Sequence, residues 1–310
     1  MRRLLNFTLQ RRKIEACDVT TSEPRDVVSS PHAQDQSILF RLLSADIRML
    51  IHEEALSDMG HLLHIVPYVG KRKRKVMGHW HCTDQKSEFP LWQHSCFGLW
   101  LEDDTRHRRL EPRSNSNLMS WLLACRRIYL EAIDVLYTVN ELNFRGASGV
   151  LLFRSQLPEH NWNKIRRLSI STVFLVPMRM ALAAHVFLPP ENYANWKAAC
   201  ETVASLRSLR CFTVDMVIKN WYDGKSWMAN ATKGVETEAF MSILSPINSI
   251  KVNEMVVEMN VEIPDDVVKM LGPLNFKVEQ RHRPYNSRLF PRPSCCRAHC
   301  QQSRWTGALV

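Results

Sequence analysis

The chain has 310 residues, a net charge of +10 and an apolar share of 45%. This size permits one or two domains with a sizeable core, and the lack of any run of about 18 uncharged apolar residues excludes a membrane-spanning helix. The basic start MRRLLNFTLQRRK has no long apolar segment, which argues against a secretory signal and leaves an intracellular protein, cytoplasmic or nuclear, with a mitochondrial presequence as the alternative.

Three regions are expected along the chain. Residues 1–36 have few periodic apolar positions and include TTSEPRDVVSSPH, which is rich in Ser, Thr and Pro, so they are predicted to be flexible. Residues 37–280 carry periodic apolar positions and are predicted to form a single domain. Residues 281–310 hold Arg and Cys but no acidic residue, and are predicted to be a flexible tail.

The domain is expected to begin with a helix within residues 37–60, where apolar residues approximate a helical stripe. Ser44 suits its N-cap. Residues 61–100 follow as a hairpin region, with strand-like runs at 62–69 and 76–82. Between these runs lie five consecutive bases, Lys71, Arg72, Lys73, Arg74 and Lys75, which must be exposed because such charges cannot be buried together.

Helix–strand units are expected over residues 118–280. Residues 117–137 read as one helix, and helical segments at 147–158, 191–206, 235–247 and 265–274 alternate with strands at 141–144, 165–176, 209–218, 252–263 and 276–281. Strands separated by helices favour parallel pairing.

The strands alternate between apolar and polar residues. Met255, Val257 and Met259 share one face, whereas Glu254 and Glu258 lie on the other. A sheet covered on both faces has almost wholly apolar strands, so one face is expected to be uncovered. The predicted fold class is therefore α/β, with a two-layer or leucine-rich-repeat-like sheet behind the first helix and the hairpin.

Residues 122–144, LLACRRIYLEAIDVLYTVNELNF, resemble a segment that characterises a fungal family of unknown function, number 7730. Residues 43–56, LSADIRMLIHEEAL, are similar to a second segment of that family, with Ser44, Asp46 and His52 departing from it. The resemblance covers roughly residues 36 to 280. It implies a fold but no chemistry, because no activity is established for the family.

The opening helix of this family looks like the start of an F-box, a helical module that docks on the adaptor subunit of cullin-type ubiquitin ligases. The favoured function is a non-enzymatic protein-interaction module of this kind. Its expected contact residues lie on the first helical stripe and on the polar sheet face: Phe40, Leu43, Ile47, Leu50, Ile51, Asp215, Glu254 and Glu258.

Two groups of residues carry zinc-ligating atoms. His79, His81, His94 and Cys96 would supply four ligands if their segments paired, and Cys295 to Cys300 form a second cluster in the tail. Neither has a standard finger spacing. The favoured interpretation is that the protein holds no metal and no cofactor, and that its scattered cysteines are reduced thiols.

Two other functions stay open. A nuclear or nucleic-acid-associated protein would act through the basic run 71–75 and the tail, although the rest of the chain lacks a dispersed basic face. An enzyme of unfamiliar type is disfavoured, because the motifs of phosphate loops, nucleophile elbows and zinc proteases are absent.

Overall fold

The structure is a computed structural model of the whole chain, and it describes residues 34, 36–57, 62–69, 75–84, 86–97, 118–176, 191–220, 233–281 and 283. Its contacts divide the chain into Met1–Ala33 and Gln34–Val310, and every described residue belongs to the second unit. The predicted flexible ends thus lie almost entirely outside the described residues.

Two helices before the hairpin pack together with two helices after it. The first two are α1 (Ile38–Leu42) and α2 (Ala45–Leu56), and the other two are α3 (Leu118–Leu122) and α4 (Arg126–Val139). Ser44 caps α2 as predicted, because its side chain accepts a hydrogen bond from the Ile47 amide. The single helix expected over residues 117–137 is instead two helices. They separate where Cys125 adopts an extended conformation and caps α4 with its sulfur, which accepts from the Ile128 amide.

Within the described residues, seven strands form one sheet in the order β2-β1-β3-β4-β5-β6-β7. The predicted hairpin is present, since β1 and β2 pair antiparallel, whereas all other neighbours pair parallel. The strands are β1 (Leu62–Val69), β2 (Lys75–His81), β3 (Glu141–Arg145), β4 (Arg167–Val176), β5 (Cys211–Asn220), β6 (Glu254–Met259) and β7 (Lys277–Gln280).

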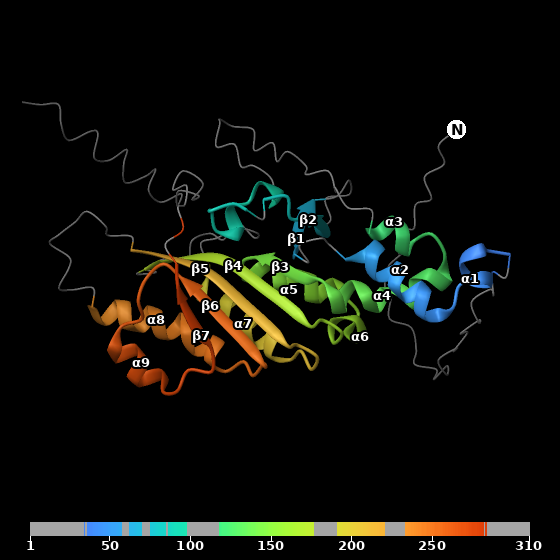
Figure 1. Cartoon of the computed structure of the whole chain (residues 1–310). Coiled ribbons are helices and arrows are strands. Elements are labelled where there is room, and N and C mark those ends of the chain that lie inside the picture. Colours follow the sequence, from blue (N-terminus) through green and yellow to red (C-terminus); the bar gives the residue numbers. More distant parts are fainter. Residues whose placement is uncertain are drawn as a thin grey trace, which may run out of the picture. The chain divides into compact units, whose positions relative to one another are not determined.

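From β3 onward each strand lies beside the next one in the chain, with helices in the connections (Figure 1). The helices are α5 (Ala147–Gln156), α6 (Glu159–Trp162), α7 (Tyr193–Ala204), α8 (Lys233–Asn248) and α9 (Asp265–Leu271). This arrangement confirms the predicted α/β class with alternating helices and strands.

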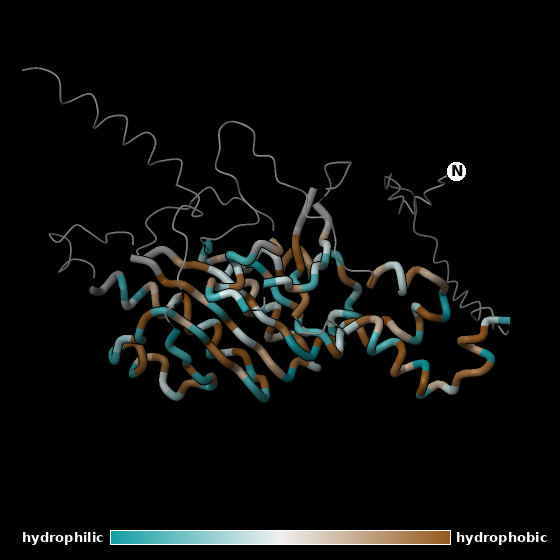
Figure 2. The backbone as a smooth tube through the Cα atoms, turned by 45° about the horizontal axis from the view of Figure 1, so that its top comes forward, coloured by the Kyte–Doolittle hydropathy of each residue, from teal (hydrophilic) through white to brown (hydrophobic). Residues whose placement is uncertain are grey.

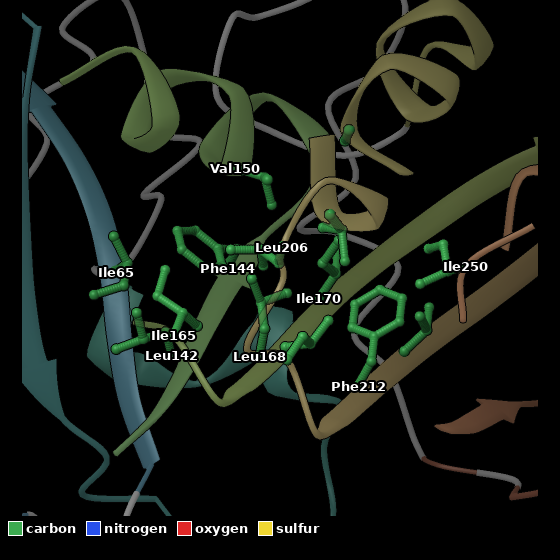
Figure 3. Close-up of a cluster of buried hydrophobic side chains, with 14 of the residues drawn as sticks. Ile65, Leu142, Phe144, Val150, Ile165, Leu168, Ile170, Leu206, Phe212 and Ile250 are labelled. Atoms are coloured by element: carbon green, nitrogen blue, oxygen red, sulfur yellow. The ribbon is translucent and has the colours of Figure 1, made fainter. Parts of the chain in front are cut away.

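The hydrophobic core lies between these helices and one face of the sheet. Apolar positions alternate with polar ones along the strands (Figure 2), and the apolar set, including Phe144, Ile170 and Phe212, points into the core (Figure 3). Val150 of α5 and Trp196 of α7 meet them from the helical layer. Burying each such side chain contributes about 1.5–3 kcal/mol, so the period-two pattern determines which face the helices cover.

The β3–α5 connection depends on a glycine and a buried carboxyl. Gly146 has φ 76° and ψ 168°, a conformation that is essentially restricted to glycine. Glu191 accepts hydrogen bonds from the Ala147 amide at 2.8 Å and from Thr172 Oγ1 at 2.6 Å. A Cβ atom on Gly146 would lie 2.5 Å from Glu191 Oε1, so this carboxyl requires a residue without a side chain.

Gly146→Ala is expected to lower the free energy of unfolding by more than about 3 kcal/mol, because backbone strain and a steric clash add. Gly272→Ala is the matched control. Gly272 has a similar conformation, with φ 70° and ψ −153°, but nothing lies within 4 Å of the position that a Cβ atom would occupy there. Urea unfolding of both variants separates the backbone strain from the steric clash with Glu191. Equal losses in the free energy of unfolding would show that the clash with Glu191 plays no part.

Candidate functional site

The polar face of the sheet carries a row of aligned side chains across three parallel strands. Ser171 of β4 pairs with Asp215 of β5, which pairs with Glu258 of β6. Ser171 Oγ donates to Asp215 Oδ2 at 2.8 Å. All three side chains are buried, with Asp215 4% exposed and Glu258 8% exposed. Such buried polar groups require hydrogen-bonding partners from another part of the chain.

Residues 90–93, which include the 3₁₀ helix η1 (Leu91–Gln93), provide these partners. The Leu91 amide donates to Asp215 Oδ2 and the Trp92 amide donates to Ser171 Oγ, both at 2.8 Å. The Trp92 side chain packs on Val173 and Val217, one step further along the same face. The expectation of an uncovered polar face is therefore wrong at this row.

Glu258 is covered from another direction. Arg283 forms a two-pronged ion pair with its carboxylate and also donates to the Phe89 carbonyl at 3.3 Å. Arg281 contributes a further contact with Glu258 at 3.4 Å. Asp215 and Glu258 are thus not available to a partner, which corrects their prediction as contact residues. Glu254, at the other end of β6, is exposed as expected.

A charged cluster joins the first helices. Glu131 of α4 accepts from Arg48 of α2 through both oxygens, at 2.8 Å and 3.0 Å. Arg127 also donates to Glu131 at 3.2 Å, and the hydrogen bond from Arg48 is the main reason why the pKa of Glu131 lies below its ordinary value. His52 lies 3.5 Å from the same carboxylate. Glu131 therefore has a structural role.

The predicted contact residues of the first helices differ in their exposure to solvent. Ile47 and Leu50 are exposed, and Leu43 and Ile51 are partly buried. Phe40 is buried at 9% exposure, with the guanidinium groups of Arg48 and Arg127 over its ring. Phe40 thus packs inside the helical unit, because α1 folds back on α2 and α4.

Three ligand-type side chains meet beside the hairpin, and only one of them, His94, belongs to the predicted four. The ligand atoms of His64, Cys82 and His94 all lie within 4.8 Å of one another, and all three residues are buried. Cys96 lies outside this group of three but close to it, because its sulfur accepts a hydrogen bond at 3.3 Å from the amide of Thr83, the residue after Cys82. Hydrogen bonding to Cys82 is also the main cause that lowers the pKa of Cys96 below its ordinary value.

His79 and His81 are excluded from this cluster by the register of the hairpin. His64 pairs with Trp80, and directly paired residues share a face. His79 and His81 flank Trp80, so they point to the opposite face. Spacing alone could not reveal this, because the register of the hairpin is what places His64 opposite Trp80.

The remaining sequence candidates lie outside the described residues: Lys71, Arg72, Lys73, Arg74 and Cys295 to Cys300. Lys75 begins β2, and its side chain also lies outside the described part. Among the helices that the structure describes, none has the length and apolar character needed to cross a membrane.

The fold and these sites define an α/β protein with a helical unit, a mainly parallel sheet and one layer of crossover helices. A family model described as "Domain of unknown function (DUF7730)" matches residues 32–268. This is more than half of the chain, so the protein belongs to the DUF7730 family. Comparisons with curated proteins and with solved structures give no match.

Arg48→Met is expected to lower the free energy of unfolding at neutral pH by about 2 kcal/mol, because it removes charge-assisted hydrogen bonds to Glu131 and one to the Leu43 carbonyl. Because the pKa of Glu131 is lowered in the folded protein, ionised Glu131 stabilises the fold fully at pH values above its ordinary pKa of 4.5. This stabilisation is lost as the pH falls through the lowered pKa. Urea unfolding should show the difference from wild type narrowing in acid. Arg210→Met, at an exposed position, is the control, and a loss as large as that of Arg48→Met would contradict the prediction.

Asp215→Asn is expected to change the pH dependence in the opposite direction. Burial raises the pKa of Asp215 above its ordinary value of 3.8, and Glu258 adds to the rise while Arg283 opposes it. Between pH 3.8 and the raised pKa, the carboxyl is largely ionised in the unfolded chain but still protonated in the folded chain. The free energy of unfolding of the wild type therefore falls as the pH rises through this window. An asparagine oxygen can still accept from Leu91 and Ser171.

The free energy of unfolding of Asp215→Asn, relative to wild type, should consequently increase over that pH window and level off above it. Chemical unfolding at a series of pH values measures this difference. Asp134→Asn, which alters an exposed carboxylate, should show no such rise. A constant difference for Asp215→Asn at all pH values would mean that Asp215 has an ordinary pKa.

Proposed function

We propose that the protein is a non-enzymatic protein-interaction module that docks through its helical unit α1–α4. The supporting observation is the concentration of exposed apolar side chains there. Nine of the twelve large hydrophobic residues exposed in the described part of the chain lie between Ile38 and Leu50 or between Met119 and Leu130. Large apolar patches on a protein surface mark interaction sites.

The geometry of α2 supports a helix-in-groove mode of binding. Ile47 and Leu50 are three residues apart and therefore project from the same side of the helix. Leu50 is 60% exposed, whereas Arg48 and His52, on another side of α2, contact Glu131. Anchors at this spacing on a helix are typical of binding to an apolar groove. The buried side of α2 fixes the direction of its exposed side.

The partner that we propose is the adaptor subunit of a cullin-type ubiquitin ligase. It is favoured by the F-box-like sequence of α2 and by the packing of α2 against α3 and α4, which supplies the helical neighbours that follow such a first helix. The sheet and its layer of helices would then carry a second recognition surface.

Leu50→Asp should abolish copurification of the ligase adaptor, because it places a charge at the centre of an apolar contact, and the loss should exceed tenfold. Met270→Asp is the matched control. Met270 is 53% exposed on α9, a helix that is not part of α1–α4. The measurement is affinity purification of the tagged full chain followed by quantification of the adaptor, with circular dichroism to verify folding.

Three results would count against the proposal. The adaptor could fail to copurify with the wild-type chain, Leu50→Asp could leave its recovery unchanged, or Met270→Asp could reduce it equally. The first result excludes the ligase adaptor as partner, and the other two exclude the helical unit as the docking surface.

A further inference from the structure

We propose that His64, Cys82, His94 and Cys96 form a structural zinc site that fastens residues 82–97 to the sheet. The four side chains come from two separate parts of the chain. His64 belongs to β1, Cys82 follows β2, and His94 and Cys96 lie around η2 (Ser95–Phe97). Two thiols and two imidazoles are a donor set that Zn²⁺ binds in tetrahedral sites.

The hydrogen bonds of His64 leave one of its nitrogens ready for a metal. His64 Nδ1 lies 2.8 Å from Asn143 Oδ1. The amide nitrogen of Asn143 donates to Ser169 Oγ, so its oxygen is the acceptor and His64 Nδ1 carries the proton. His64 Nε2 then has a lone pair, and it is buried without a hydrogen-bond partner. An unpaired buried nitrogen is costly, and metal coordination would satisfy it.

His94 is oriented in the same way through its other nitrogen. Its Nε2 lies 3.3 Å from the carbonyl of Phe89. A carbonyl only accepts, so Nε2 carries the proton and Nδ1 has the lone pair. Nδ1 lies 3.4 Å from Cys82 Sγ. Metal-ligating histidines usually donate their second nitrogen to a carbonyl or amide oxygen in this manner.

The sulfur of Cys96 accepts a hydrogen bond from the backbone of Thr83 and lies within hydrogen-bonding distance of its hydroxyl. The amide and the hydroxyl of Thr83 both lie 3.3 Å from it. Such donors stabilise a thiolate, which is the form of cysteine that binds zinc. All four residues are buried, so the site is closed and has no open position for a substrate. This geometry fits a structural site.

A metal here would have a mechanical role. The segment 82–97 holds η1, whose amides satisfy Ser171 and Asp215 on the sheet. Tying Cys82 and Cys96 to His64 of β1 fixes the segment near both ends. This inference does not depend on the proposed adaptor function, because none of the four residues belongs to α1–α4.

The test is metal analysis of the untagged full chain purified without chelator. Inductively coupled plasma mass spectrometry should find about one zinc ion per chain. After replacement with Co²⁺, the visible spectrum should show tetrahedral d–d bands and a thiolate-to-cobalt band. Cys82→Ser and His64→Asn should lower the zinc content at least tenfold. His81→Asn, from the same hairpin but the opposite face, and Cys211→Ser should retain it.

Removing zinc from the wild-type chain should also lower its melting temperature, and adding zinc back should restore it. These wild-type measurements decide the question even if a ligand variant fails to fold. The assignment is overturned if the folded wild-type chain contains no zinc, if iron or copper occupies the site, if Cys82 and Cys96 form a disulfide, or if His81→Asn loses the metal as completely as Cys82→Ser.

Discussion

The structure depends on the need to satisfy a row of polar groups in the middle of a parallel sheet. Asp215 is buried on β5 with Ser171 and Glu258 as its lateral neighbours. A buried carboxyl without partners costs several kcal/mol. The partners come from backbone amides of residues 91 and 92 and from Arg283. The sheet therefore needs a segment that the helix–strand units themselves do not supply.

That segment has little regular structure of its own. Residues 82–97 contain only two 3₁₀ helices of three residues each among their described positions, and such short helices contribute little cooperative stability. Their position has to come from fixed points. One fixed point is the apolar contact of Trp92 with Val173 and Val217. Another is the Phe89 carbonyl, which accepts hydrogen bonds from Arg283 and from His94. The proposed metal site would be the strongest of these attachments.

The amino-acid pattern allowed the sheet to be predicted but not its cover. Alternation in residues 209–218 and 252–263 identifies the apolar face, because a strand places every second side chain on the same side. The covering segment has no period, and its partners Ser171 and Asp215 lie 79 and 124 residues away. Asp215 and Glu258, which looked like part of a recognition surface, instead form a buried contact, and nothing local in the sequence distinguishes the two cases.

The same limit applied to the histidines. Residue types and spacing indicated zinc-ligating atoms in residues 79–96, and His94 does lie in the observed cluster, with Cys96 beside it. The histidine from the hairpin depends on strand register, which decides that His64 and not His79 or His81 shares the face of Trp80. Register follows from which strands pair and where their turn falls, and a run of five bases gives no turn type from which to derive it.

In the helical unit, the residues that hold the helices together differ from the exposed apolar residues of the proposed docking surface. The two segments that carry the family resemblance meet at Arg48 and Glu131. The side chain of Asn140 donates to the carbonyls of Leu56 and Leu136, so the end of α2 is tied to the end of α4 immediately before β3. The polar side of α2 thus holds this helix to α4, while Ile47 and Leu50 are exposed. Because attachment and exposure use different residues, a charge at Leu50 leaves the links through Arg48 and Asn140 in place. A loss of partner binding in that variant would then report on the surface rather than on the fold.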